Sequence, residues 1–579
     1  MAQITTWRER RARFMHRHHA RRAGRMALAT EFVATPEPRT IGVSERGAQL
    51  IAGKFLFSGL FVEGKNYTVW DIAEAYPDVA DEIHGCDWLD DLVAVGDKTA
   101  QALAQKWVLA WMAKYGDGRS GGWMPGITGR RLIRWINHGP FLLRGKDEPT
   151  SAKFFQNLAG QTVFVARRWK TTKPGLHRFE ALAGTVYASL SLQSLEHHAE
   201  GAIVALAQDC AAAIGPDGSI VTRQPEELLD ILGLLNWTSQ TLTHATRPIP
   251  SEISDAIARI VPTLRALRHA DGSLARFHGG GEGVDGRLDA ALFASGIKTL
   301  PKDQTHMGFA RLAAGRTTLI ADAAAPPEGR ASAQAHASTL SFELTSGRRP
   351  LIVNCGSGAR FGDEWRRASR ATPSHSTMMI AGASSSHLGP KGRMPNGDEL
   401  LTELPTRVQA EFSATHMGRK LELSHNGYQR AYGLTHARVL MLSANGRSLV
   451  GEDMFSTLGP DDQTVFDHAL PQEGLPFVIR FHLHPEVKPA IDAEGTAVSL
   501  TLKSGEIWVL RHDGAAKLSL AQSVYLQNRQ LKPVATQQVV LSGRAMAYAT
   551  RVRWSLAKTP DTPLAVRDFA QADSLDAID

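Results

Sequence analysis

Two different spacings of apolar residues divide this chain. Between about residues 87 and 270, apolar side chains recur at helical spacing. In "TAQALAQKWVLAWMAKYG", Leu103, Trp107 and Trp111 follow one another in steps of four, which places them on one face of a helix. Six similar segments follow, and their short connections carry Gly, Pro or Asp. Consecutive helices joined in this way predict antiparallel neighbours, as in a bundle, a solenoid or a helical toroid.

Beyond about residue 305 the pattern changes to short apolar runs. Examples are "TLSFELTSG", "PLIVNCG", "FVIRFHLHP" and "AVSLTLKSG", each bounded by Gly, Asn, Asp or Pro. The pair Asn445 and Gly446 in "SANGRS" is a hairpin-turn signal between two such runs. Strands at this spacing over the rest of the chain predict a large antiparallel β-sandwich.

The fold class expected from these patterns is therefore α+β and multidomain, because 579 residues exceed one compact core. The change of pattern places the boundary between the halves near residues 296–306. We expect a basic tail and lead-in over 1–49, a helical domain over 50–300 and a β-sandwich over 301–579. A cleft between the two halves is the expected ligand site, since binding sites favour domain interfaces.

Composition excludes several classes of protein. Apolar residues make up 43% of the chain, which is ordinary for a globular protein. The three cysteines, Cys86, Cys210 and Cys355, are far apart and form no CxxC, which excludes a disulfide scaffold or a cysteine zinc knuckle. No run of about 18 apolar residues occurs, so no membrane-spanning helix is expected.

The formal charge of +7 favours anionic partners such as acidic glycans, nucleic acid or a membrane surface. Part of the excess lies in the first 25 residues, which carry eight arginines and one glutamate. This tail is interpreted as a solvated basic helix, a surface-binding segment or an unusual export segment; its apolar run "MALAT" is shorter than that of a signal peptide. Nucleic acid is not expected as a partner, because the remaining charge is nearly balanced and no recognition motif occurs.

The first candidate site residues lie in "LHRFEALAGTVYA". On a helix, His177 and Glu180 are neighbours on one face, and His177 is followed by the cationic Arg178. Tyr187 extends this stripe about 15 Å further along the axis, too far to share one bond-breaking step. A His–Glu pair that caps the helix, and a Tyr187 that belongs to the core, are the alternative interpretations.

Further candidates lie in the predicted sandwich and just before it. His336 precedes one strand, Asn354 ends another, and His375 stands at the start of a third in "ATPSHSTMMI". Two histidines and an oxygen ligand at separate strand ends could converge on a divalent metal such as Zn²⁺. His278 lies in the glycine-rich "FHGGGEG", where the backbone can approach a ligand closely. It could equally be a histidine packed within a loop.

The order of "LHRFEALAGTVYASL", "PDGSI", "AHASTLSFEL", "LIVNCG" and "ATPSHSTMMI" resembles that of the heparinase II/III-like family of polysaccharide lyases. The resemblance covers the chain from about residue 50 to its end. It implies an incomplete (α/α) toroid packed on an antiparallel β-sandwich. It also implies β-elimination at uronic-acid linkages of an acidic polysaccharide. A periplasmic or cell-envelope location follows from the family, although a cytoplasmic one stays open because no signal peptide is recognisable.

The resemblance also implies roles for individual residues. β-Elimination requires neutralisation of the uronate carboxylate, a base for the C5 proton and an acid for the leaving oxygen. The residues with implied catalytic roles are His177, Arg178, Glu180, His278, His336 and His375. Those with implied substrate contacts are Tyr187, Gln334 and Arg370. The implied zinc ligands are His336, Asn354 and His375, although no cofactor is required.

Several positions depart from the family pattern. The resemblance places Glu227 where the family has its catalytic tyrosine, so His278 is a candidate substitute for that proton donor. Gln334 replaces a histidine, and Asn354 replaces an aspartate, which weakens the expected metal affinity. Two functions therefore follow from the sequence: a polysaccharide lyase, or a catalytically impaired glycan-binding or cell-envelope protein of the same fold. The sequence specifies neither the polysaccharide nor the oligomeric state.

Overall fold

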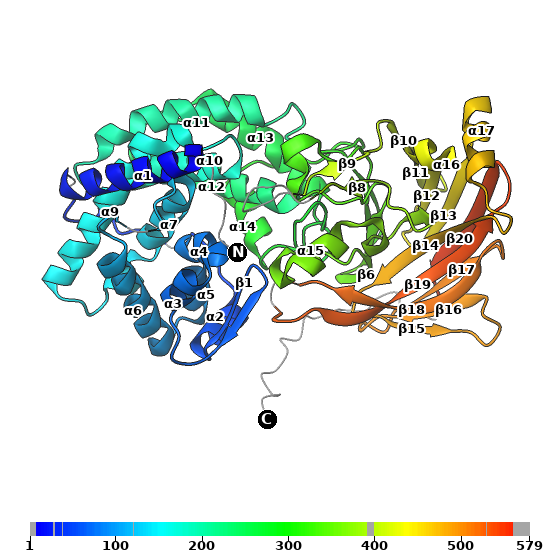
Figure 1. Cartoon of the computed structure of the whole chain (residues 1–579), viewed down its shortest axis with the longest axis horizontal. Coiled ribbons are helices and arrows are strands. Elements are labelled where there is room, and N and C mark those ends of the chain that lie inside the picture. Colours follow the sequence, from blue (N-terminus) through cyan, green and yellow to red (C-terminus); the bar gives the residue numbers. More distant parts are fainter. Residues whose placement is uncertain are drawn as a thin grey trace.

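A helical half and a β-sandwich half lie next to each other along the longest axis of the molecule (Figure 1). The structure is a computed structural model that describes residues 7–26, 29–37, 39–119, 121–390, 399–527 and 530–559. The last helix of the helical half ends at Ala294, and the first strand of the sandwich begins at Phe309.

The helical half is a ring of mostly antiparallel helices around a core rich in tryptophan. Its helices are α1 (Trp7–Met26), α2 (Ser44–Ile51), α3 (Val69–Ala75), α4 (Pro77–His84), α5 (Asp87–Val95), α6 (Lys98–Lys114), α7 (Pro125–Asn137), α8 (Gly139–Leu143), α9 (Glu148–Arg168), α10 (Leu176–Ser191), α11 (Ala199–Ala213), α12 (Pro225–His244), α13 (Ser251–Ala266) and α14 (Arg287–Ala294). The predicted stripe of α6 is confirmed, because Trp107 and Trp111 are buried and Leu103 packs against the same core. A short hairpin of β1 (Lys54–Phe57) and β2 (Leu60–Glu63), which the sequence patterns did not indicate, interrupts the helices.

Helix α10 is the centre of the ring and packs against α7, α9, α11 and α12. It crosses α7 at a point where both helices carry glycine. A Cβ atom on Gly184 would lie 2.6 Å from the Cα of Gly129, so a side chain there would force the two helices apart. This close crossing fixes α7 and α10 relative to each other, and both contribute to the candidate site described below.

The basic N-terminal tail forms helix α1, which packs against α9. His16, Ala20 and Ala23 are buried on the packed face, and burial lowers the pKa of His16 to about 4. The helix was predicted, but it is not solvated on all sides, because small residues three apart allow close contact with α9.

The β-half is a sandwich of two antiparallel sheets. Its strands are β3 (Phe309–Ala314), β4 (Thr317–Asp322), β5 (Phe342–Ser346), β6 (Arg349–Val353), β7 (Met378–Ile380), β10 (Val408–Thr415), β11 (Gly418–Tyr428), β12 (Leu434–Ser443), β13 (Ser448–Ser456), β14 (Leu475–Leu483), β15 (Lys488–Ile491), β16 (Ala497–Thr501), β17 (Ile507–His512), β18 (Lys517–Tyr525), β19 (Val534–Ala545) and β20 (Ala549–Lys558). Outside the sheets lie the strand pair β8 (His387–Leu388) and β9 (Leu401–Thr402) and the helices α15 (Asp363–Arg370), α16 (Gln429–Tyr432) and α17 (Pro460–Ala469).

One sheet has the order β10-β11-β12-β13-β20-β17-β16-β15. The other has the order β18-β19-β14-β6-β5-β4-β3, and β7 pairs with β14. The predicted hairpin is present between β12 and β13, where Gly446 adopts φ +69° and its N–H donates to the Ser443 carbonyl at 2.9 Å. The inward faces of the two sheets form the second core of the protein.

A buried arginine joins the two halves. Arg223, which precedes α12, forms a 2.6 Å ion pair with Asp322 at the end of β4. Its other N–H groups donate to the backbone carbonyls of residues 307–308 and 324–325. Asp322 is fully buried, so this contact fixes the sandwich against the ring through charge-assisted hydrogen bonds.

The chain was not expected to cross a membrane. In the part of the chain that the structure describes, no helix is both long enough and apolar enough to do so.

Candidate functional site

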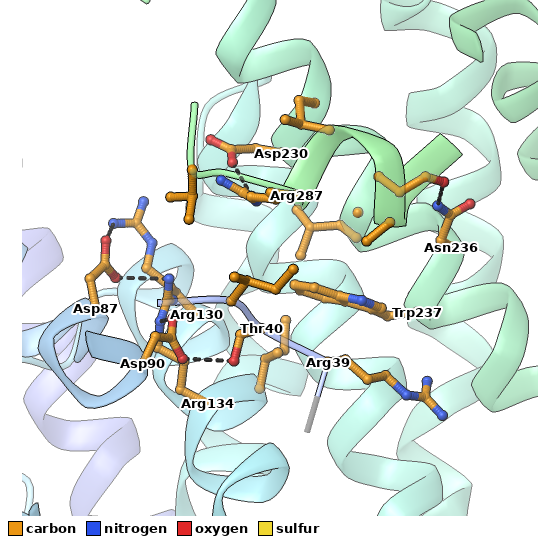
Figure 2. A pocket seen from close by; sticks show the side chains of 18 of the residues that line it. Arg39, Thr40, Asp87, Asp90, Arg130, Arg134, Asp230, Asn236, Trp237 and Arg287 are labelled. Carbon is orange, nitrogen blue, oxygen red and sulfur yellow. Dashed lines mark hydrogen bonds and ion pairs between the residues drawn. The ribbon is translucent and has the colours of Figure 1, made fainter. Parts of the chain in front are cut away.

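A cavity of about 530 Å³ opens inside the helical ring (Figure 2). Its lining comes from residues 39–41 and from α2, α5, α7, α10, α12 and α14, together with Val284. All of these residues belong to the helical half, whereas the sequence suggested a cleft between the halves. Five arginines and six carboxylates line the cavity, so its charge is nearly balanced.

One wall of the cavity is formed by ion pairs of α7. Arg130 and Arg134 are one turn apart; Arg130 contacts Glu180 of α10 at 2.6 Å and Arg134 contacts Asp90 of α5 at 2.7 Å. Burial alone would raise the pKa of Glu180, but Arg130 and the hydrogen bond from His177 outweigh burial and hold this pKa at about 2. Glu180 is therefore ionised and fully engaged by its two partners.

The opposite wall is formed by α12 and α14. Asp230 of α12 pairs with Arg287 of α14, and Glu226 accepts the Gly281 N–H at 2.8 Å. Burial, with a smaller contribution from Asp230, raises the pKa of Glu226 and favours its neutral form. Trp237 lies two to three turns further along α12 and presents its ring to the cavity (Figure 2).

The cavity continues along α12 into a second hollow. Asn236 and Gln240 line both, and the second hollow extends to Thr243 and His244 at the end of the helix. At 1.5 Å per residue, the lining from Glu226 to His244 spans about 27 Å. The combined hollow is elongated, with amide, hydroxyl, aromatic and charged groups along one helix.

Three of the predicted site residues of α10, His177, Arg178 and Tyr187, lie in three separate environments. His177 hydrogen-bonds through Nδ1 to Glu180 Oε2 at 2.8 Å, its side chain is 65% exposed, and this bond raises its pKa. Arg178 turns toward α11, where it pairs with Asp209 at 2.6 Å. Tyr187 is buried and donates its O–H to Asn137 Oδ1 at 2.5 Å, and burial raises its pKa to about 12.

Glu227, which the resemblance places at the position of the family tyrosine, is held by a neighbouring hydroxyl. Thr222 Oγ1 donates to Glu227 Oε2 at 2.8 Å, and burial raises the pKa of Glu227. Of the sequence-predicted site residues, Glu180 is the one that lines the cavity.

The predicted histidines of the sandwich side meet one another in the interior. His336 Nδ1 and His375 Nε2 are 3.0 Å apart, and the N–H of His336 donates to His278 Nδ1 at 3.2 Å. All three are buried, with at most 3% of each residue exposed. The structure therefore brings these three together but does not bring them to His177 or to the cavity.

The atoms that would bind the predicted zinc ion are already engaged in hydrogen bonds. His375 donates Nδ1–H to the Ala371 carbonyl at 2.9 Å, so its Nε2 is an acceptor and His336 Nδ1 carries the proton between them. Asn354 Oδ1 accepts the Ser376 N–H at 3.0 Å. Within the described ranges, no three His, Cys, Asp or Glu side chains gather as metal ligands. Two hydrogen-bonded imidazoles and one neutral amide do not fit a three-ligand Zn²⁺ site in this arrangement, and the metal stays a prediction.

The two remaining predicted contacts lie at the boundary between the halves. Gln334 is exposed and its Cβ approaches Gly279, next to His278. Arg370 is buried and donates at 2.8 Å to the carbonyls of Ala335, Ser332 and Glu399. Arg370 therefore orders the backbone before β5 and, through Glu399, the backbone before β9, and its substrate contact stays a prediction.

Most of the cavity lining was not predicted from the sequence. The four-residue spacing of Arg130 and Arg134 in "GRRLIRW" was a signal, because it places both on one helical face. Arg39 and Trp237 carried no signal, since their shared environment depends on how distant segments pack.

Comparison with known proteins places this fold. A family model described as heparinase II/III-like, C-terminal, matches residues 297–555. The FtsZ-localized protein C of Caulobacter vibrioides is 30% identical over 530 residues, covering 90% of this chain and 89% of that protein.

Two solved structures give the same architecture. Heparinase III matches with a TM-score of 0.67 at 13% identity, covering 94% of this chain and 89% of that one. A mutant heparan sulfate lyase from Pedobacter heparinus matches with a TM-score of 0.56 at 13% identity, covering 95% and 89%. These likenesses show the fold and confirm the predicted toroid and antiparallel sandwich. The chain thus belongs to the heparinase II/III-like family, whose fold is that of polysaccharide lyase-like proteins.

Proposed function

We propose that this protein binds a segment of acidic polysaccharide along α12, in the cavity of the helical ring. The observation that carries the proposal is the elongated hollow beside Trp237, with Asn236 and Gln240 next to the ring. An aromatic ring packs against the apolar face of a sugar, while amides and charged groups bind its hydroxyl and acidic groups. The family and the fold support a polysaccharide as the ligand class.

We propose binding rather than turnover because most of the groups to which the resemblance assigns catalysis are buried or engaged by other side chains in this chain. An acid and a base must both reach the same sugar linkage. Glu180 is ion-paired, Tyr187 is buried, and the imidazoles of His336 and His375 lie below the surface of the sandwich. The chain therefore corresponds to the second of the two functions expected from its sequence, a glycan-binding protein that keeps the lyase fold.

A calorimetric titration combined with a product assay tests this proposal. The purified protein is mixed with hyaluronan, alginate, polygalacturonate or heparan sulfate, and the ultraviolet absorbance of unsaturated product is followed. We expect heat of binding with at least one polymer and no rise in absorbance. Trp237→Ala should abolish most of the binding, whereas Trp7→Ala, an exposed tryptophan of α1, should not.

Two results would contradict the proposal. A steady rise in absorbance would establish a lyase, and binding to none of the four polymers would remove the glycan as ligand.

As a second candidate function, we propose that the protein localises with FtsZ. The relative whose name states this property is 30% identical across both halves of the chain, whereas the solved lyases are 13% identical. A fluorescent fusion expressed in Caulobacter vibrioides should follow labelled FtsZ through the cell cycle. A distribution that ignores FtsZ would overturn this proposal and leave the glycan proposal standing. The periplasmic or envelope location stays a prediction.

A further inference from the structure

The arginines that line the cavity differ in one respect: four of them are neutralised by carboxylates. The neutralised pairs are Arg46 with Asp91, Arg130 with Glu180, Arg134 with Asp90, and Arg287 with Asp230. The two remaining lining carboxylates are also engaged, because Asp87 contacts Arg134 at 3.1 Å and Glu226 accepts the Gly281 N–H. These pairs hold the walls together and leave little net charge for a ligand.

Arg39 is the fifth arginine, and no carboxylate pairs with it in the described part of the chain. Its guanidinium lies 5.9 Å from the centre of the Tyr187 ring. Its Nη1 is buried and has no hydrogen-bond partner among the described residues. A buried N–H donor without a partner is costly, so an acceptor supplied by a ligand would be favoured there.

The position of Arg39 sets it apart from the ion-paired wall. In the view of Figure 2, its guanidinium lies away from the pairs of Arg130 and Arg134. Arg39 and Trp237 both line the same cavity. The Tyr187 contact restrains the side chain. Because Arg39 as a whole is half-buried and lines the cavity, the N–H groups other than Nη1 are the ones that a planar anion meets first.

We propose that Arg39 recognises the acidic group of the bound sugar, a carboxylate or a sulfate. This inference rests on the proposed function and adds the residue that makes the site specific for acidic over neutral glycans. The guanidinium fork matches the two oxygens of a carboxylate and forms charge-assisted hydrogen bonds with it. Arg39 is then a specificity-determining residue, and Trp237 holds the sugar irrespective of its charge.

The test compares hexasaccharides of hyaluronan, alginate and polygalacturonate, each in native and carboxyl-reduced form. A carboxyl-reduced heparin hexasaccharide supplies a sulfate-only arm. We expect Arg39→Gln to weaken binding of the native probes by about 10- to 100-fold. Binding of the carboxyl-reduced, uncharged probes should not change. If the group recognised is a sulfate, the loss appears with the heparin probe instead.

The matched control is Arg430→Gln, which removes the same charge from an arginine that is 86% exposed on the sandwich. It should leave all affinities unchanged. Arg39→Lys keeps the charge without the fork and should bind native probes with intermediate affinity. Both Arg39 variants should unfold at the wild-type temperature, because neither loses an ion pair. If Arg39→Gln does not fold, the affinity of Arg39→Lys for the native probes tests the role of Arg39 instead.

The experiment distinguishes a failure of the proposed glycan binding from a failure of the role proposed for Arg39. If the wild type binds no probe, the proposed function is overturned, and this inference with it. If the wild type binds the probes and Arg39→Gln binds each of them with the wild-type affinity, Arg39 does not recognise the acidic group, while glycan binding stands.

Discussion

The contact between the ring and the sandwich depends on Arg223, and replacing it by methionine should destabilise the whole protein. The substitution keeps most of the side-chain volume but leaves Asp322, which is fully buried, without its cation. Removing one partner of a buried ion pair costs about 3–5 kcal/mol, because the other charge stays desolvated. The free energy of unfolding should fall by that amount.

Urea unfolding followed by circular dichroism measures this loss. Arg268→Met is the control: its partner Asp289 is more than half exposed, so the loss should stay within about 1 kcal/mol. Adding Asp322→Asn to Arg223→Met should recover part of the stability, since the uncompensated charge disappears. A loss below about 1 kcal/mol for Arg223→Met would refute the role of this contact in joining the halves.

Three other predictions concern the ring and the histidines. Gly184→Ala should destabilise the protein by about 1–3 kcal/mol, because the added Cβ would collide with Gly129. Gly201→Ala on α11 is the control and should be neutral or stabilising, because open space surrounds Gly201. Thermal unfolding of the two variants measures the difference. The pKa of His177 is raised by Glu180, so this pair stabilises the fold below the unfolded-state pKa of about 6.5, and the contribution is lost as pH rises through the higher folded-state pKa. An NMR titration should show the His177 pKa falling in Glu180→Gln, and an unchanged value would contradict the pairing. Treatment with EDTA should leave glycan binding unchanged, because Trp237, the α12 amides and Arg39, the groups proposed to bind the glycan, are not metal ligands. A loss that Zn²⁺ alone restores would instead support a metal at the buried histidine pair.

Much of the fold could be predicted because it depends on local periodicity. The four-residue apolar steps of α6 and the alternating burial along β12 are visible in the sequence. The Asn445–Gly446 turn is equally local, since a positive φ at Gly446 is a property of that residue. The hairpin of β1 and β2 was missed because its four-residue strands are too short to establish a period.

The candidate site could be predicted only in part, for a physical reason. His177 and Glu180 are neighbours on one helix, so their hydrogen bond follows from spacing. The cavity instead collects side chains from segments far apart in the chain. Arg130 pairs with a carboxylate, whereas Arg39 pairs with none among the described residues, and this difference depends on tertiary packing that no local pattern records.

The contact between His336 and His375 could be predicted only in part. His375 lies three residues before β7, as the sequence suggests, whereas His336 lies in a loop six residues before β5 and not at the start of the strand. Their 3.0 Å contact therefore depends on how that loop packs. Their burial was not predictable, because it depends on how segments far apart in the chain pack together.

The most direct test of glycan binding in the ring is a crystal structure of the protein with an acidic hexasaccharide that it binds. We expect sugar density along α12, with one sugar ring against Trp237 and an acidic group at Arg39. Density between the helical ring and the sandwich, with the α12 cavity filled by solvent alone, would contradict this expectation.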